Sequence, residues 1–408
     1  MKVWSKNGED VSKSIEEFTA GKDVELDKQL LKYDVAASIA HAKMLHKIGV
    51  VSEEELNELL AALEKAKSME LDPALEDVHA NVEAFVTKET PAGKKLHTAR
   101  SRNDLVATDM LLYSKEKLVE TVKVLKELAG ELQALPPLPV PGFTHMQKAM
   151  PTTLEHWGCS HAESLVNDCE YIDATIKVID KCPLGACAGF GSVFPVDREM
   201  LAEELGFSGV HWNTLSAVNS RGKNSSFALN ALAAVGLDLS KLAQDLLLLY
   251  LLDMVSFDDS VCTGSSVMPQ KKNCDALELV KAKASVVMGL QAAMLGVCVG
   301  LPSGYNRDEQ ETKKLLMQAF GEIIPAVKAV SEVVAAMEPH PDKMLAGCSE
   351  EVLATDKAAL EALKGTPWRD AYKSNAGSIS VEDSIGMKKV QGFPGNPSKP
   401  LKKTETKS

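Results

Sequence analysis

Positive charge is scarce in this sequence of 408 residues. It contains 45 Lys and Arg residues against 57 Asp and Glu residues, which gives a net charge of -12. Nucleic acids and anionic membranes are bound through a basic face, so neither is an expected partner. A local basic pocket for a small anionic substrate is still compatible with this composition.

The sequence also has little that points outside the cytoplasm. Its eight cysteines are scattered and form no CxxC pair, which favours a reducing cytoplasmic compartment over a disulfide-rich scaffold. The N-terminal stretch MKVWSKNGEDVSKSIEEF has no apolar core of the kind found in secretory signals. One stretch, residues 284–301, has 18 residues without a formal charge, and we expect a helix buried in a bundle there rather than a membrane span.

Alternating patterns of the kind that predict strands are scarce, whereas helical patterns are long. Leu118, Val122, Leu125, Ala129 and Leu132 follow spacings of four and three and form one apolar stripe. Long helices are predicted over about 104–135, 224–255, 275–301 and 313–337, and Pro136 ends the first. Helices this apolar need partners, so the prediction is an all-α multi-helix bundle or an oligomer that shares one.

Two shifts in composition divide the chain into three predicted domains. Residues 91–93 (Pro-Ala-Gly) precede the first long helix, and residues 338–341 (Glu-Pro-His-Pro) follow the last. The predicted domains are an N-terminal helical domain (1–96), a central long-helix domain (97–338) and a small C-terminal helical domain (339–408). After about residue 376 the sequence becomes rich in Gly, Pro, Ser and Lys, which predicts a poorly ordered tail.

Three polar segments interrupt the helical pattern and carry residues suited to chemistry. The first, HTARSRND (97–104), offers Arg100, Arg102 and a helix start capped by Asn103 or Asp104, either as an anion-binding end or as a charged cap only. The second, PGFTHMQKAMP (141–151), presents His145 at a predicted helix start, as a proton-transfer group or as a structural histidine.

The third polar segment, TGSSVMPQKKN (263–273), leads into a long apolar helix. Gly264 and two serines suit a mobile loop, and Lys271, Lys272 and Asn273 gather donors that would hold a carboxylate or phosphate. The alternative is a solvated basic helix start. The segment lacks the GxxxxGK[ST] spacing of a P-loop, and no His, Cys and carboxylate cluster predicts a metal site.

Taken together, the three segments resemble the signatures of the fumarase/aspartase lyase superfamily. The pattern GSSxMPxKxN is matched at every fixed position by residues 264–273. Within that superfamily the chain is most similar to the argininosuccinate lyase family, whose patterns HTxRSRND, PGxTHxQ and GSSxMPQKKN appear here as HTARSRND, PGFTHMQ and GSSVMPQKKN. Shorter matches extend the resemblance over roughly residues 4 to 375, at 77–79, 183–198, 305–310, 354–356 and 367–369.

The resemblance implies a three-domain all-α lyase whose long helices form the core of a homotetramer with active sites shared between subunits. The implied reaction is the reversible β-elimination of argininosuccinate to L-arginine and fumarate in arginine biosynthesis, with no cofactor or metal. Negative charge builds on a substrate carboxylate as the Cβ proton leaves, and the departing guanidinium nitrogen needs a proton, so base and acid must lie on opposite sides.

By resemblance, individual residues take individual roles. Ser265 would be the base, and His145, paired with Glu278, would be the acid-side or polarising group. Lys271 and Asn273 would stabilise the developing dianion. The substrate-binding positions that match are Asp27, Arg102, Asn103, Thr144, Asn273, Tyr305, Gln310 and Lys313.

The chain departs from the family pattern at a few positions. Cys274 stands where the family usually has proline, which loosens the loop but removes no reacting group. Asp23 falls where a serine often contacts substrate, and residues 213–221 match weakly.

Two alternative functions stay open. A sibling lyase would act on adenylosuccinate, fumarate or aspartate, although residues 270–272 (Gln-Lys-Lys) favour argininosuccinate. A catalytically silent structural protein, like the delta-crystallins, is disfavoured because His145, Ser265, Lys271 and Glu278 are all present.

Overall fold

The computed structural model describes residues 12–21, 23–374 and 377–390, and these fall into two compact units. Unit 1 comprises described residues within 1–119, 172–231 and 289–320, and unit 2 those within 120–171, 232–288 and 321–408. Both are built mainly from helices, which confirms the all-α prediction. The predicted boundaries at 96 and 338 are not tested by this division and stay a prediction.

Five long helices contribute residues to both units. They are α6 (Arg102–Gln133), α7 (Leu154–Ile179), α10 (Arg221–Leu251), α11 (Asp275–Cys298) and α12 (Gln310–Ala335). Four of them were predicted within a few residues, and α6 ends at Gln133, shortly before Pro136, as expected. The predicted apolar stripe from Leu118 to Leu132 is buried throughout. No long helix was predicted for α7.

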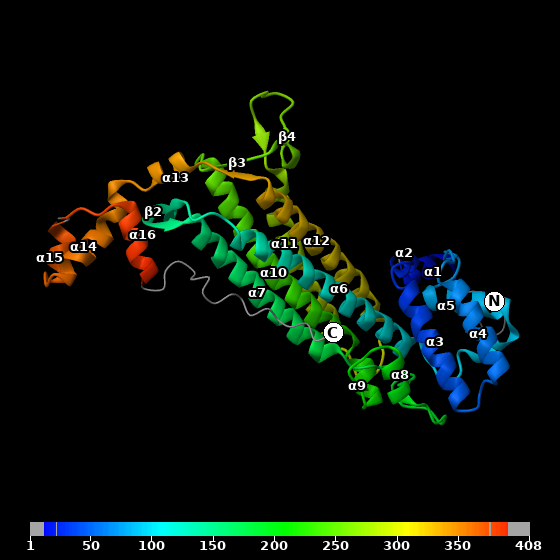
Figure 1. Ribbon diagram of the computed structural model, residues 1–408. Helices are drawn as coiled ribbons and strands as arrows, with labels where there is room; N and C mark the ends of the chain where they lie inside the picture. The colour runs from blue at the N-terminus through cyan, green and yellow to red at the C-terminus, as the bar shows by residue number, and fades with distance from the viewer. Residues whose placement is uncertain (1–11, 22, 375–376, 391–408) are drawn as a thin grey trace. The chain divides into compact units, whose positions relative to one another are not determined.

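Unit 1 begins with short helices followed by a small bundle. Figure 1 shows α3, α4 and α5 packed together, and α4 starts with a capping box in which Ser52 and Glu55 exchange hydrogen bonds of 3.2 and 2.9 Å. Leu45, Leu59 and Val86 are fully buried in this bundle. Besides the long helices, the elements of unit 1 are α1 (Lys13–Ala20), α2 (Asp23–Asp27), α3 (Leu31–Lys47), α4 (Glu53–Ala66), α5 (Val78–Glu89), η1 (Pro91–Lys95), α8 (Arg198–Glu204), α9 (Thr214–Asn219) and η3 (Arg307–Glu309).

In unit 2 the segments of the five long helices run side by side (Figure 1). Two glycines permit the close approach. A Cβ on Gly158 of α7 would lie 2.3 Å from the carbonyl oxygen of Leu132 on α6, and one on Gly236 of α10 would lie 3.4 Å from the Cα of Ala284 on α11. The backbones of these helices therefore touch where the glycines stand, which fixes their spacing.

Short strands and small helices complete unit 2. Two of the antiparallel ladders join β1 to β2 and β3 to β6, and the third joins β4 to β5 below the 263–273 loop. The elements are β1 (Pro139–Thr144), β2 (Gln147–Thr153), β3 (Val255–Phe257), η2 (Asp259–Val261), β4 (Thr263–Gly264), β5 (Lys272–Asn273), β6 (Met337–Pro339), α13 (Pro341–Gly347), η4 (Glu350–Leu353), α14 (Ala354–Leu363), α15 (Trp368–Ser374) and α16 (Val381–Val390).

The prediction of a poorly ordered tail after about residue 376 is wrong for residues 381–390. Residues 381–390 form helix α16, because Ser380 caps its first turn, Ile385 is buried and Lys388 makes an ion pair of 2.8 Å with Asp356. Residues 391–408, the rest of the predicted tail, lie outside the described residues.

Helix α11 differs from expectation in its burial. Leu277, Val280 and Val287 are buried, but Leu279 and Val286 on the same helix are about half exposed. Of its most apolar window, 22% is buried, so the prediction of a helix buried all round is wrong for the single chain. By length and composition α11 could cross a membrane, and among the described helices no other meets these criteria.

Candidate active site

Unit 1 contains a polar cavity of about 110 Å³ where several predicted substrate-binding residues meet. Arg102, Asn103, Tyr305, Gln310 and Lys313 all line it, although they come from two widely separated parts of the sequence. The other lining residues are Asp23, Glu76, Asp77, His79, Val106, Arg221 and Arg307. The Arg and Lys side chains among them, Arg102, Arg221, Arg307 and Lys313, make the cavity suited to an anionic ligand.

Arg102 reaches the cavity because it is the first residue of α6. Ser101 is the cap of this helix: its Oγ accepts from the N–H of Asn103 at 3.2 Å, and its own N–H donates to Asp104 at 3.0 Å. The prediction that Asn103 or Asp104 caps the helix is therefore wrong by two or three positions. Arg102 then pairs with Glu76 and Asp77 at 3.0 and 3.1 Å, which hold its guanidinium at the cavity.

Arg100, by contrast, does not belong to the cavity. Its side chain is buried and donates to the Oγ of Ser38 at 2.9 Å, so the predicted anion-binding role fits Arg102 and not Arg100. The neighbouring Asp104 is fully buried and also accepts from the N–H groups of Gly185 and Cys187. Burial raises the pKa of Asp104 to about 6, against the opposing effect of these N–H groups. The hydrogen bonds of the Asp104 carboxylate thus connect the start of α6 to residues 185–187.

Tyr305, Arg307 and Gln310 line the cavity from the segment that leads into α12. Arg307 donates to Glu76 at 3.4 Å, and both Arg307 and Gln310 donate to the carbonyl oxygen of Thr19. The guanidinium of Arg221, at the start of α10, lies 5.6 Å from the centre of the Tyr305 ring. Arg221 is buried and its Nε has no protein partner among the described residues, so part of its donor capacity is unused.

Lys313, which lines the cavity, forms a buried ion pair with Asp27, which does not. Lys313 Nζ lies 2.5 Å from Asp27 Oδ1 and 3.3 Å from Asp23, while Asp27 Oδ2 accepts from the N–H of Val78 at 3.0 Å. Asp27 is 1% exposed and does not line the cavity. Its observed contacts hold Lys313 and the start of α5, and its predicted contact with substrate stays a prediction.

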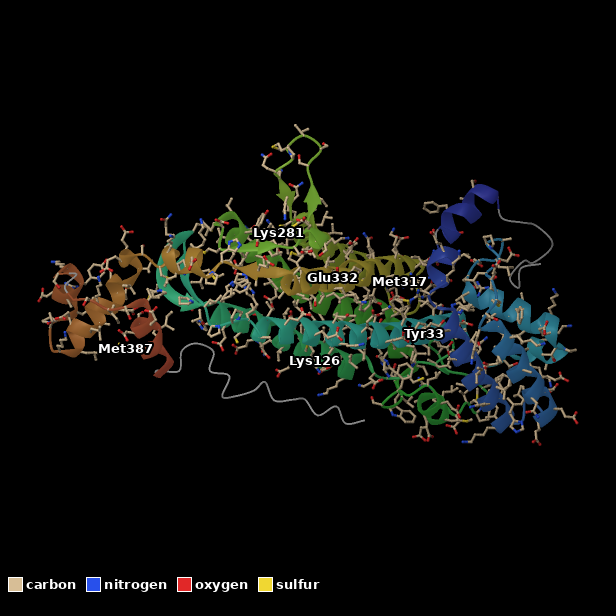
Figure 2. The ribbon with its side chains drawn as sticks, turned by 45° about the horizontal axis from the view of Figure 1, so that its top comes forward. Tyr33, Lys126, Lys281, Met317, Glu332 and Met387 are labelled. Carbon is tan, nitrogen blue, oxygen red and sulfur yellow. The ribbon has the colours of Figure 1, made fainter. Side chains whose placement is uncertain are left out.

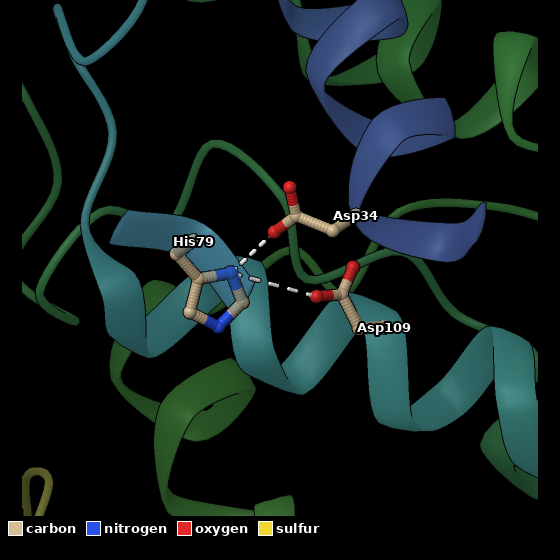
Figure 3. Close-up of side chains that lie close together, drawn as sticks. All are labelled: Asp34, His79 and Asp109. Atoms are coloured by element: carbon tan, nitrogen blue, oxygen red, sulfur yellow. Dashed lines mark hydrogen bonds and ion pairs between the residues drawn. The ribbon is translucent and has the colours of Figure 1, made fainter. Parts of the chain in front are cut away.

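His79 lines the cavity and also contacts two buried carboxylates, Asp34 and Asp109. Figure 3 shows these three side chains. The Nδ1 of His79 is hydrogen-bonded to Asp34 and lies 3.7 Å from Asp109. Burial opposes the charged imidazolium, but Asp34, Asp77 and Asp109 outweigh it and raise the pKa of His79 to about 9. The cationic ring therefore neutralises part of a fully buried acidic cluster.

Asp34, His79 and Asp109 also have the geometry of a possible metal site. Their nitrogen and oxygen ligand atoms all lie within 4.8 Å of one another, and no other such group was found among the residues that the structure describes. The protonation of these side chains does not favour a bound metal ion. A metal ligand must be a deprotonated nitrogen, whereas Nδ1 of His79 already shares its proton with Asp34 and the ring is cationic at neutral pH. The imidazolium supplies the positive charge that a metal would supply.

In unit 2, Ser265 lies on the loop between β4 and β5, which projects from the helices in Figures 1 and 2. Its Oγ accepts hydrogen bonds from the N–H groups of Val267 and Met268, at 3.3 and 3.0 Å. Two donors to one oxygen stabilise the alkoxide relative to the hydroxyl, which is what a serine base requires. The predicted role of Ser265 as the base stays a prediction.

The base of the same loop is held by polar contacts. Asn273 donates to the carbonyl oxygen of Gly264 at 3.3 Å, Thr263 donates to Asp275, and Lys272 pairs with Asp259. Lys271 is exposed and directly precedes β5. Asn273 is therefore oriented by the hairpin, whereas Lys271 presents its ammonium group to solvent in the single chain.

His145 lies at the tip of a hairpin and not at a helix start. Strand β1 ends at Thr144 and β2 begins at Gln147, so His145 and Met146 form a two-residue turn, with φ values of 53° and 59°. Positive φ at both positions is the geometry of a type I′ turn, which favours the twist of hairpins. Helix α7 begins nine residues after His145, at Leu154, so the predicted placement of His145 was wrong. Thr144 and His145 are both exposed.

Glu278 is exposed on the first turn of α11. Among the described residues of this single chain, no hydrogen bond or ion pair joins Glu278 to His145. The predicted pairing of these two side chains stays a prediction.

Among the Asp, Glu, Lys and Arg residues of the cavity, four received no role from the sequence: Glu76, Asp77, Arg221 and Arg307. Arg307 stands inside the quoted 305–310 match but received no role, and Glu76 directly precedes the quoted 77–79 match. Arg221 ends the weakly matching 213–221 stretch. Each of these residues lies within or next to a matched motif, and that position was the signal by which the sequence could have identified it as a cavity residue.

Comparison with known proteins places the chain among lyases. The lyase family model matches residues 8–289. The argininosuccinate lyase of Thermotoga neapolitana is 37% identical over 386 residues, covering 91% of this chain and 96% of the relative. That of Sorangium cellulosum is 36% identical over 418 residues, covering 97% of this chain and 96% of the relative.

Solved structures support the same fold at lower sequence identity. An EDDS lyase in complex with formate superposes with a TM-score of 0.77 at 23% identity, covering 94% of this chain and 77% of that one. A class II fumarase from Schistosoma mansoni superposes with a TM-score of 0.76 at 14% identity, covering 92% of this chain and 91% of that one.

Proposed function

This chain belongs to the argininosuccinate lyase family, and we propose that it catalyses the reversible elimination of argininosuccinate to L-arginine and fumarate. The observation that carries the proposal is the cavity of unit 1. Five residues predicted to bind substrate converge there with two further arginines, Arg221 and Arg307. Argininosuccinate carries several carboxylates, and arginine side chains are the residues best suited to bind carboxylates through paired hydrogen bonds.

The acidic residues of the cavity fit the cationic part of the same substrate. Glu76 and Asp77 now pair with Arg102, and Glu76 also with Arg307. A ligand with both carboxylates and a guanidinium group exchanges these internal ion pairs for its own, so little uncompensated charge is created on binding.

The 263–273 loop supplies several of the groups that the chemistry needs, and His145 and Glu278 supply others. Ser265 would remove the Cβ proton, with the resulting oxygen charge stabilised by the N–H groups of Val267 and Met268. Lys271 and Asn273 would stabilise the carboxylate dianion that forms, and His145 with Glu278 would act where the guanidinium nitrogen departs. None of these steps requires a metal or cofactor.

We propose that the enzyme works as a homotetramer with active sites shared between chains. Leu279 and Val286 on α11 leave an apolar face half exposed, and packing against other copies would remove it from water. The cavity of about 110 Å³ is also small beside the roughly 300 to 1,000 Å³ of typical ligand pockets, which supports completion by other chains.

A cytoplasmic location is proposed from the eight scattered cysteines.

The test is a turnover assay of the purified protein with argininosuccinate, in which fumarate is followed by its ultraviolet absorbance and L-arginine by chromatography. We expect both products in equal amounts. Turnover of adenylosuccinate, fumarate or aspartate in its place would assign the chain to a sibling lyase. A folded protein that turns over none of these substrates would match the silent, delta-crystallin-like alternative.

A further inference from the structure

Two cysteines face each other at the base of the loop that carries Ser265. Cys262 directly precedes β4 and Cys274 directly follows β5. In the ladder Thr263 pairs with Asn273 and Gly264 with Lys272, so Cys262 and Cys274 occupy the next opposed positions. Their Sγ atoms are 3.9 Å apart, and all eight cysteines are free thiols.

The backbone at this position suits a disulfide. Opposed residues of an antiparallel pair have Cα atoms about 4.5 to 5.5 Å apart, which lies inside the range of about 4.4 to 6.8 Å found in disulfides. A bond would bring the two Sγ atoms from 3.9 Å to about 2.05 Å, a change that side-chain rotation can supply. By the resemblance of the third polar segment, Cys274 stands where the family usually has proline.

The two thiols also differ in exposure. Cys262 is half-buried and reachable from solvent, whereas Cys274 is 4% exposed. Burial, with Cys262 as the next cause, raises the pKa of Cys274 to about 12, so Cys274 is protonated at neutral pH and a poor first nucleophile. The reachable thiol is therefore the one that meets an oxidant first, and the buried one is placed to react second.

We propose that Cys262 and Cys274 form a redox-sensitive pair that hydrogen peroxide converts to a disulfide across the base of the 263–273 loop. The Cys262 thiol loses its proton, the thiolate sulfur attacks one peroxide oxygen, and the O–O bond breaks to give Cys262 sulfenic acid and hydroxide. The hydroxide takes up the proton released by the thiol and leaves as water. The Cys274 sulfur then attacks the sulfenic sulfur, losing its proton as the S–S bond forms and the S–O bond breaks, and a second water leaves. Two thiols lose two electrons in total, and one peroxide gains them.

The disulfide would restrict the loop, because the present contacts at its base are all reversible. Lys272 pairs with Asp259, and the hydroxyl of Tyr250 donates to the carbonyl oxygen of Lys272 at 3.4 Å. A covalent bond between Cys262 and Cys274, one residue beyond the Thr263–Asn273 pair of the ladder, prevents the strands from separating or sliding. An effect on turnover rests on the proposed function: where Ser265 and Lys271 reach substrate by movement of the loop, oxidation lowers turnover.

The bond itself is tested without reference to activity. The native protein is treated with hydrogen peroxide, alkylated and digested with trypsin, which cuts after Lys271 and Lys272 and so separates the two cysteines unless they are linked. We expect a disulfide-linked pair of peptides, which dithiothreitol reduces to two separate peptides. Cys262→Ser and Cys274→Pro should abolish it, and Cys159→Ser, which removes a half-buried thiol of helix α7, should not. Stable Cys262 sulfenic acid without the linked pair would overturn the proposal.

The effect on turnover is measured on the same samples. We expect a severalfold loss of fumarate release on oxidation, restored by dithiothreitol, and no such loss in Cys274→Pro. If the linked peptides formed but turnover stayed unchanged, the proposal that the disulfide restricts the 263–273 loop would be wrong. Because the peptide measurement needs no substrate, a protein that fails to cleave argininosuccinate would refute the proposed function while leaving the cysteine pair under test.

Discussion

The N–H group of Met268 donates a hydrogen bond of 3.0 Å to the Oγ of Ser265. A second donor, the N–H of Val267, lies 3.3 Å from the same oxygen. Because both donors belong to the loop backbone, they accompany Ser265 wherever the loop moves. The oxygen that would take the proton thus carries its own stabilising groups, whether or not Lys271 is near.

Substitution of Ser265 tests this arrangement. Ser265→Ala should lower turnover by about 10²- to 10⁴-fold, the usual range for a general base, because it removes the proton acceptor and little volume. Substrate affinity and thermal unfolding should change little. Ser266→Ala is the matched control, since this exposed neighbour should have a much smaller effect. Wild-type turnover in Ser265→Ala would exclude Ser265 as the base.

The buried histidine of unit 1 should make stability depend on pH. His79 has a pKa of about 9 in the folded protein and about 6.5 when unpaired, so its charge stabilises the fold below pH 6.5 and this contribution is lost as pH rises through 9. The free energy of unfolding from urea titrations should therefore fall between pH 6.5 and 9, and His79→Gln should show a flatter dependence.

His41 provides the control for this measurement. Burial lowers the pKa of His41 to about 3, so it stays neutral over the whole range. Its Nε2 lies 2.8 Å from the carbonyl oxygen of Thr98, and His41→Gln should lower stability by a similar amount at each pH. If His79→Gln and wild type showed the same pH dependence, His79 would not be protonated in the folded protein.

A pair of glycines tests the packing of α6 and α7. Gly158→Ala should destabilise unit 2 by about 1 to 3 kcal/mol or more, because the added Cβ would meet the Leu132 carbonyl oxygen at 2.3 Å. Gly130→Ala, on an exposed and open part of α6, should instead stabilise by about 0.5 to 1 kcal/mol through helix propensity. Urea midpoints report both. An equal effect of the two substitutions would contradict the observed helix spacing.

The long helices were predictable because their apolar spacing is a local signal. The stripe from Leu118 to Leu132 lies within one helix, and each of its residues is buried as predicted. The hairpin at His145 was not predictable in the same way. Its turn residues are His and Met, where hairpins of this type usually have Asn and Gly, so the sequence lacks the common turn signal.

The candidate site was predictable in part, for reasons that also lie in particular residues. Arg102, Tyr305 and Gln310 were found through motifs and do meet at one cavity. The ion pair of Asp27 with Lys313 joins residues 286 positions apart, and no local pattern reveals such a pairing. The exposed side of α11 was missed because the apolar composition of a helix does not tell whether its own chain or another copy covers it.

Shared active sites are tested most directly by complementation of two inactive variants. His145→Asn keeps a residue that tolerates the left-handed turn, and Ser265→Ala keeps the loop, so both chains should fold. Refolded together in equal amounts, they should regain about one half times one half, or roughly a quarter, of wild-type activity, because some sites draw both intact residues from different chains. Mixing the two folded proteins should restore less. Inactive refolded mixtures, with wild type refolding well under the same conditions, would place both residues of each site on one chain and contradict the shared site.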